Sequence, residues 1–96
     1  MAALSSAAIR VLTALAEDDQ AVVITVRREY ATEWSARMKT RGDAYSTAAR
    51  FALRITTFHS LRHTGLIAKA REWEVFGLIY AEYELTDAGR AALEST

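Results

Sequence analysis

Cysteine and proline are both absent from the 96-residue sequence, and glycine occurs only four times. Without cysteine the chain has no disulfide, no thiolate metal ligand and no cysteine nucleophile, which fits a reducing compartment, so we expect a cytoplasmic location. Internal repeats and linker-like stretches are also missing, and residues 1–96 are expected to form a single domain. The opening stretch, residues 1–19, has its one cation, Arg10, inside the apolar part and acids close behind it, which fits neither a signal peptide nor a membrane span.

The net charge is zero, with 12 cations and 12 acids, but the two signs are segregated along the chain. Residues 37–71 hold eight cations and one acid, Asp43, whereas the rest of the chain holds four cations and eleven acids. Such segregation predicts a surface with one electropositive face and an acidic remainder. The alternative is that folding interleaves the two sets of charges.

The first part of the sequence predicts a helix, a short strand and a second helix. Ser5 or Ser6 can cap a first helix that ends near Glu17. The β-branched run in residues 21–26 favours a short strand, although it could instead form the first turns of the next helix. That helix is predicted over residues 27–38, because apolar residues recur there at every fourth position. These residues are Val26, Tyr30, Trp34 and Met38.

A further helix is predicted over residues 46–63, after a loop at residues 39–45 that contains a Gly-Asp turn signal. Ser46 or Thr47 can cap it. One of its faces is apolar, and another carries cations and a hydroxyl, which is typical of a helix that reads DNA. The alternative reading of that second face is a solvated cationic surface. The residues on it are Arg50, Arg54 and Thr57.

The last third predicts the end of a helix, a β-hairpin and a new helix. Gly65 falls where the helical pattern stops, the usual place for a left-handed cap. Pairing Leu66 with Leu85 places the hairpin turn at about residues 74–77, and Thr86 supplies the N-cap of the last helix. Three apolar residues, Trp73, Val75 and Phe76, then stand near the hairpin tip. The two largest, Trp73 and Phe76, are either exposed to a partner or folded onto the domain, unless the hairpin register differs by two residues.

Two sequence signatures in this region form a recognisable pair. The first is Leu61 followed by Gly65-Leu66-Ile67, and the second is Y-E-L-T-D-A-G-R at residues 83–90 followed by Leu93. Together they resemble winged helix-turn-helix regulators of the MarR and PadR type, over about the last 45 residues. The resemblance implies an α+β winged helix-turn-helix fold in the order helix, strand, helix, helix, strand, strand, helix.

The resemblance also implies a function. A protein of this type would be a sequence-specific DNA-binding protein, here a small transcriptional repressor that binds double-stranded DNA. It would act as a homodimer, because Leu4, Leu12 and Leu15 of the first helix and residues 91–93 of the last would be free to pair with a second copy.

The expected DNA contacts lie on the predicted helix 46–63, in the loop before it and on the first wing strand. Arginines on the helix can donate two hydrogen bonds to guanine in the major groove or pair with phosphate. Cations in the loop and the wing would hold phosphates, and such contacts position the protein without specifying a sequence. The expected DNA-binding residues are Lys39, Arg41, Ser46, Thr47, Arg50, Arg54, Thr57, Lys69 and Arg71.

Metal binding and catalysis find little support in the sequence. His59 and His63 are four residues apart, but zinc needs three or four ligands and no cysteine or suitably spaced third histidine is present. The sequence shows no nucleophile with a base nearby and no phosphate-binding glycine loop. We therefore expect neither a cofactor nor an enzyme.

Two other functions would use the same features. A winged helix can serve as a protein–protein interaction module, here through Trp73, Phe76 and the acidic hairpin strands, because fold does not fix function. A phage- or plasmid-type role in DNA packaging, excision or replication would use the same DNA surface as a repressor. DNA binding requires four particular cations to lie together on one positive face, and the interaction module is favoured if they do not. The four cations are Arg50, Arg54, Lys69 and Arg71.

Overall fold

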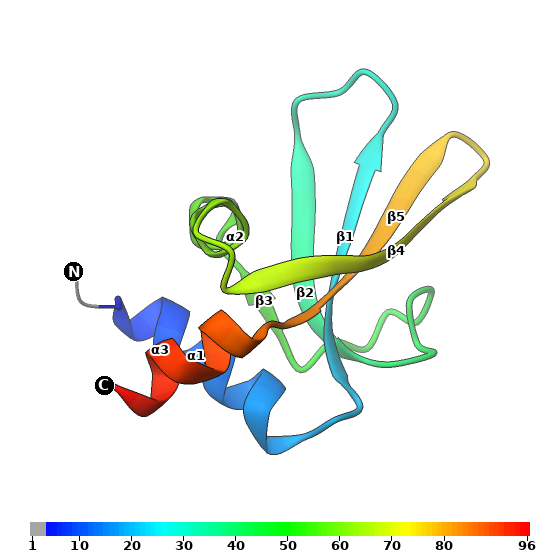
Figure 1. Ribbon diagram of the computed structural model, residues 1–96. Helices are drawn as coiled ribbons and strands as arrows, with labels where there is room; N and C mark the ends of the chain where they lie inside the picture. The colour runs from blue at the N-terminus through cyan, green and yellow to red at the C-terminus, as the bar shows by residue number, and fades with distance from the viewer. Residues whose placement is uncertain (1–3) are drawn as a thin grey trace.

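The computed structural model describes residues 4–96, and within them it shows an α+β protein with three helices and one five-stranded antiparallel sheet (Figure 1). The strand order across the sheet is β3-β2-β1-β5-β4. None of the helices in residues 4–96 is long and apolar enough to cross a bilayer. The elements in chain order are α1 Ser6–Glu17, β1 Ala21–Arg28, β2 Trp34–Thr40, β3 Phe51–Leu53, α2 Ile55–His63, β4 Ile67–Val75, β5 Leu78–Leu85 and α3 Asp87–Glu94.

The three helices pack on one face of the sheet, so the sheet has a helix-covered face and a helix-free face (Figure 1). Val23 and Met38 are partners across β1 and β2 and point into the core under the helices. Ile24 points the opposite way, as alternation along a strand requires. It packs against Ala44, which belongs to the loop of residues 41–50 that covers part of the helix-free face.

The first predicted helix and the first predicted strand are confirmed. Ser5 caps α1, since its Oγ accepts a hydrogen bond from the backbone N–H of Ala8 at 3.1 Å, and the helix ends at Glu17. The β-branched run forms β1, which continues as far as Arg28.

The apolar stripe of α1 is buried within its own chain. Leu12 is 0% exposed and Leu15 is 6% exposed, and both pack with Phe58 and Leu61 of α2. α1 also packs against α3. The expectation that Leu12 and Leu15 are free to pair with a second copy is therefore wrong.

The predicted helix over residues 27–38 is wrong, because β2 occupies Trp34–Thr40. Trp34, Ala36 and Met38 are apolar at every second position with polar residues between them, which is the period of a half-buried strand. A spacing of four residues satisfies both the helical and the strand period. The every-fourth stripe therefore could not distinguish the two structures.

The predicted helix over residues 46–63 is correct only in its second half, where α2 spans Ile55–His63. Residues 46–50 have no regular structure, and β3 follows them at the edge of the sheet. Ser46 does not cap a helix, since its Oγ accepts a hydrogen bond from the backbone N–H of Ala48 in a local turn. Arg54 occupies the N-cap position of α2 instead, without a side-chain capping bond.

The predicted end of α2 is confirmed. Gly65 has a φ of 76°, and the backbone N–H of Leu66 donates to the carbonyl of Leu61 at 3.0 Å to close the last turn. The predicted N-cap of the last helix is confirmed as well. Thr86 Oγ1 accepts a hydrogen bond from the N–H of Gly89 at 3.0 Å.

The predicted β-hairpin is confirmed, with small differences in register. Ile67 rather than Leu66 pairs with Leu85, and a bulge between Lys69 and Arg71 shifts the pairing again. The turn falls at residues 76–77, inside the predicted range.

Candidate nucleic-acid interface

α2 packs against the sheet through a narrow apolar side and turns a polar side outward. Phe58 and Leu61 are buried, at 0% and 2% exposure. The outward side is formed by the exposed residues Thr56, Ser60 and His63. Hydroxyl and imidazole groups can hydrogen-bond to base edges or phosphates, and an α-helix fits the major groove of DNA. α2 is therefore an element that could read a duplex.

Two arginines from different elements lie over the indole ring of Trp34, next to α2. The Arg27 guanidinium is 5.1 Å from the ring centroid and the Arg62 guanidinium is 5.2 Å from it. The ring also contacts Phe58 and His59, with centroid separations of 5.9 Å and 5.3 Å. These five residues form the Trp34 cluster. Stacking on an aromatic ring restrains a guanidinium while its N–H groups stay available to a ligand.

Within the described residues, no carboxylate neutralises the positive charge of Arg62. Its Nη2 donates a hydrogen bond to Nδ1 of His59 at 3.2 Å, and its Nε is buried without a hydrogen-bond partner in the described residues. Burial, followed by the charges of Arg62 and His63, lowers the pKa of His59 and favours the neutral imidazole that can accept this bond. Within residues 4–96, neither Arg27 nor Arg62 has a carboxylate oxygen within 4.0 Å.

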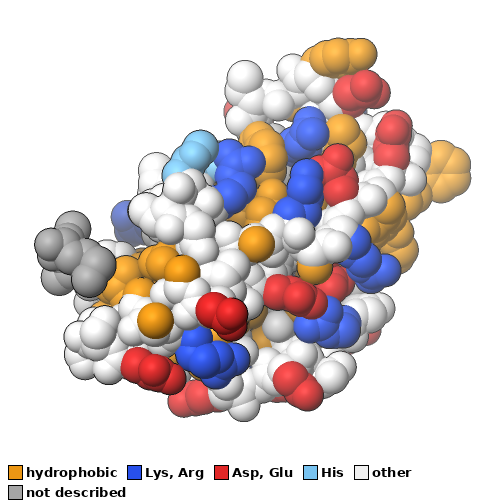
Figure 2. Space-filling view, in the orientation of Figure 1, with side chains coloured by type: hydrophobic (Ala, Val, Ile, Leu, Met, Phe, Trp, Pro, Cys, Tyr) orange, Lys and Arg blue, Asp and Glu red, His pale blue; other side chains and the backbone are white. Residues whose placement is uncertain are grey.

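β4 adds a lysine on the same side of the molecule. Lys69 Nζ pairs with Glu72 Oε2 at 2.7 Å. The pKa of Glu72 is lowered, chiefly by the hydrogen bond from Lys69 and also by the charges of Lys69 and Arg27, which shows that Arg27 lies near this pair. Figure 2 shows Lys and Arg side chains gathered between α2 and the β4–β5 hairpin, with apolar groups among them. Three cations thus lie beside the polar side of α2, on a face of the sheet that also carries the carboxylates Glu72 and Glu74.

The nine predicted DNA-binding residues are divided between two faces of the molecule. The bulge in β4 is one cause, because it places Lys69 opposite Tyr83 on the helix-covered face and Arg71 opposite Glu82 on the helix-free face. Arg54 and Thr57 line a hollow of about 180 Å³ between α1, β3 and the start of α2. The others lie in or beside β2, in the loop that follows β2, or on the helix-free side of β4. They are Lys39, Arg41, Ser46, Thr47, Arg50 and Arg71.

Most of the predicted cations are also paired with acids. Arg50 Nη2 lies 2.7 Å from Asp18 Oδ2. Arg41 Nη1 lies 2.8 Å from Glu82 Oε1 and 2.6 Å from Glu84 Oε1, and Arg71 Nη2 lies 3.4 Å from Glu82 Oε2. The basic segment of the sequence is therefore interleaved with acids from distant parts of the chain. Arg50, Arg54, Lys69 and Arg71 do not form one continuous positive face.

Lys39 has a structural role in the fold. It is only 7% exposed, and its Nζ donates to the carbonyls of Ala44 at 3.0 Å and Ser46 at 2.6 Å. These two bonds attach the loop of residues 41–50 to β2. We expect Lys39→Met to lower the free energy of unfolding by about 1–3 kcal/mol, because two buried carbonyls lose a charged donor.

Urea denaturation measures this effect, and Arg37→Met is the matched control on the same strand. Arg37 is exposed, so its replacement should change stability by less than about 0.5 kcal/mol. Equal stability of the two variants would contradict the role assigned to Lys39.

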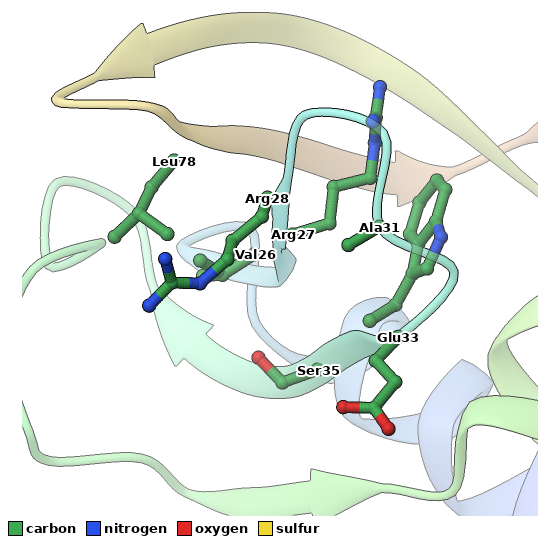
Figure 3. Close-up of a pocket in the computed structure, with 8 residues that line it drawn as sticks. Val26, Arg27, Arg28, Ala31, Glu33, Ser35 and Leu78 are labelled. Atoms are coloured by element: carbon green, nitrogen blue, oxygen red, sulfur yellow. The ribbon is translucent and has the colours of Figure 1, made fainter.

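An open hollow of about 290 Å³ lies at the free end of the β1–β2 hairpin, next to Leu78 at the start of β5 (Figure 3). Arg27 and Arg28 point to opposite sides in this view. The hollow therefore adjoins both the Trp34 cluster and the helix-free face. Its lining also includes Val26, Glu33 and Ser35.

His59 and His63 stack along α2 with ring centroids 6.2 Å apart. In the part of the chain that the structure describes, no group of three His, Asp or Glu side chains lies close enough to hold a metal ion.

Arg27, Trp34 and Arg62 are not among the residues that the sequence predicted to contact DNA. Arg27 and Trp34 are partners across β1 and β2, and the period of two in residues 34–40 was the signal that could have placed them together. No family model, curated protein or solved structure matches the chain. The function must therefore be argued from the chemistry of this surface.

Proposed function

We propose that the chain is a DNA-binding protein that places α2 in the major groove of double-stranded DNA. The observation that carries the proposal is the pair Arg27 and Arg62, restrained over Trp34 beside the polar side of α2, with no carboxylate partner in residues 4–96. Guanidinium groups bind phosphate through two parallel hydrogen bonds, and restrained ones lose less freedom on binding. Lys69 would add a contact to the same backbone.

A winged-helix type of fold is part of the proposal. α2, the β4–β5 hairpin and α3 follow one another in the order that the MarR and PadR resemblance implies. β2, the loop of residues 41–50 and β3 stand where the resemblance expects another helix. The resemblance further supports a small transcriptional repressor that binds as a homodimer to half-sites about 34 Å apart.

A protein-interaction module is the second candidate. The separation of Arg50, Arg54, Lys69 and Arg71 favours it, and so do the tips of the two hairpins. DNA binding ranks first because it rests on a different pair of cations, Arg27 and Arg62. Phe76 is 102% exposed and Tyr30 is 94% exposed, and both have a positive φ that is costly for residues with a large side chain. Figure 2 shows hydrophobic side chains at these two ends of the molecule. Trp73, in contrast, stacks on Tyr80 at 5.6 Å and is folded onto the sheet.

Titration of a fluorescent duplex of about 20 base pairs decides between the two candidates. The DNA-binding proposal predicts saturable binding whose logarithmic affinity falls with salt at a slope of about −2 to −3 for each protomer bound, corresponding to two or three phosphate contacts per protomer. Absence of binding at about 100 μM protein in low salt, with any duplex, would reject it and leave the interaction module.

A further inference from the structure

The helix-free face of the sheet has an excess of positive charge. Five cations from β1, β2, the following loop and β4 lie on it, against two carboxylates from β5. The cations are Arg28, Arg37, Arg41, Arg71 and the buried Lys39, whose ammonium group is bonded within the fold. The strand carboxylates are Glu82 and Glu84, and the loop that contains Arg41 also contains Asp43. Within residues 4–96, Arg28 and Arg37 have no carboxylate within 4.0 Å, and both are exposed.

Three aromatic rings from different segments lie next to one another on this face. Trp73 of β4 and Tyr80 of β5 are nearly parallel, at an interplanar angle of 13°. Tyr45, from the loop of residues 41–50, meets Tyr80 edge-on at 5.0 Å and accepts a hydrogen bond from Trp73 Nε1 at 2.5 Å. Arg71 lies 4.6 Å from the Trp73 ring centroid. Although it is held in this way, Tyr45 remains 62% exposed.

A purely structural role explains only part of this arrangement. Trp73 and Tyr80 cover Val22 and Ile24, which are buried at 0% and 2% exposure, so these two rings have a packing function. That function does not require an ordered but exposed Tyr45 ring or two arginines without acidic partners. Exposed aromatic rings flanked by arginines on an open sheet are the chemistry that binds unpaired bases and their phosphates.

We infer that the helix-free face binds single-stranded nucleic acid. Unpaired bases stack on Tyr45 and the adjoining rings, and Arg28 and Arg37 hold the phosphates. A duplex is disfavoured here, because its bases are already stacked and a flat sheet face does not enter a groove. The inference goes beyond the proposed function, since it concerns a different ligand and the opposite face of the sheet. The hollow beside Arg28 adds room at the end of this face (Figure 3).

The chain has two tryptophans, one on each face, and they allow a direct test. In a proton–nitrogen NMR titration with an oligothymidylate of about 15 nucleotides, the indole N–H signal of Trp73 should shift and that of Trp34 should stay in place. A shift of Trp34 alone, or of neither signal at about 100 μM protein, would overturn the inference.

Variants separate stacking from charge attraction. Tyr45→Ser should weaken oligothymidylate binding roughly five- to a hundredfold, whereas Tyr45→Phe, which keeps the ring, should bind within about threefold of the wild type. Arg28→Glu with Arg37→Glu should weaken binding at least about tenfold. Arg27→Glu with Arg62→Glu, on the other face, should leave it nearly unchanged.

Two further results would count against the inference. Equal binding by Tyr45→Ser and the wild type would show that the ring takes no part. Equally tight binding of polyglutamate would show charge attraction without recognition of bases, and the ligand would then be an acidic peptide. Neither result depends on duplex binding through α2, so this inference can fail while the proposed function stands.

Discussion

Changing Arg27 and Arg62 together to glutamate is expected to lower the affinity for duplex DNA at least about a hundredfold. Each change removes a charge-assisted contact with phosphate, worth about 1.5–3 kcal/mol, and brings a carboxylate close to the DNA backbone. Because about 1.4 kcal/mol corresponds to a tenfold change in a binding constant, two such contacts give the expected factor. Fluorescence anisotropy with a labelled duplex at about 0.1 M salt measures it.

The matched control is the double change Arg28→Glu and Arg37→Glu, which alters the net charge equally on the helix-free face. It should lower duplex affinity only about threefold, since its charges are remote from the DNA and screened by salt. The Arg62 guanidinium lies over the Phe58 and Trp34 rings, so the pair Arg27→Gln and Arg62→Met provides a second test that removes the charge and leaves an unbranched apolar side chain beside these rings. If the two double glutamate variants lost duplex affinity equally, the assignment of the interface to α2 would be contradicted.

Replacing Gly89 by alanine is expected to destabilise the fold by roughly 3 kcal/mol. Gly89 is buried in α3, and a Cβ at this position would lie 2.1 Å from the backbone oxygen of Leu66 and 2.7 Å from Leu85 Cδ1. A backbone carbonyl at the start of the hairpin cannot rotate away, so α3 would have to move outward. The gain in helix propensity, about 1 kcal/mol, is too small to offset this.

Chemical denaturation of Gly89→Ala and of Ala88→Gly measures the effect. Ala88 is the exposed neighbour in the same helix, and its replacement by glycine should cost only about 1 kcal/mol. A Gly89→Ala protein as stable as the wild type would show that α3 is not held against Leu66 as closely as the structure indicates.

The last third of the chain was predictable because its signals are local. Gly65 closes α2 through its own left-handed backbone, and Thr86 caps α3 through its own hydroxyl. Such features depend on a few neighbouring residues, and sequence patterns report them directly.

The middle of the chain could not be read in the same way. The spacing of Trp34 and Met38 fits a helix and a strand equally well, and the one local signal for a strand is the apolar Ala36 between them. Pairing with β1 then fixes this segment as a strand. The positions of the cations in the basic segment also depend on tertiary ion pairs and strand pairing. Arg50 meets an acid from the end of α1, and the bulge beside Lys69 turns Arg71 to the other face. These are properties of the tertiary structure that composition along the chain does not encode.

We propose that duplex DNA binds on the α2 side of the molecule. Titration of the nitrogen-15-labelled protein with a duplex of about 20 base pairs, read from the two indole N–H signals, tests it most directly. The account predicts that the Trp34 signal shifts together with the backbone amides of Thr56, Ser60 and His63, while the Trp73 signal stays in place. A shift of Trp73 with no change at Trp34 or along α2 would contradict it.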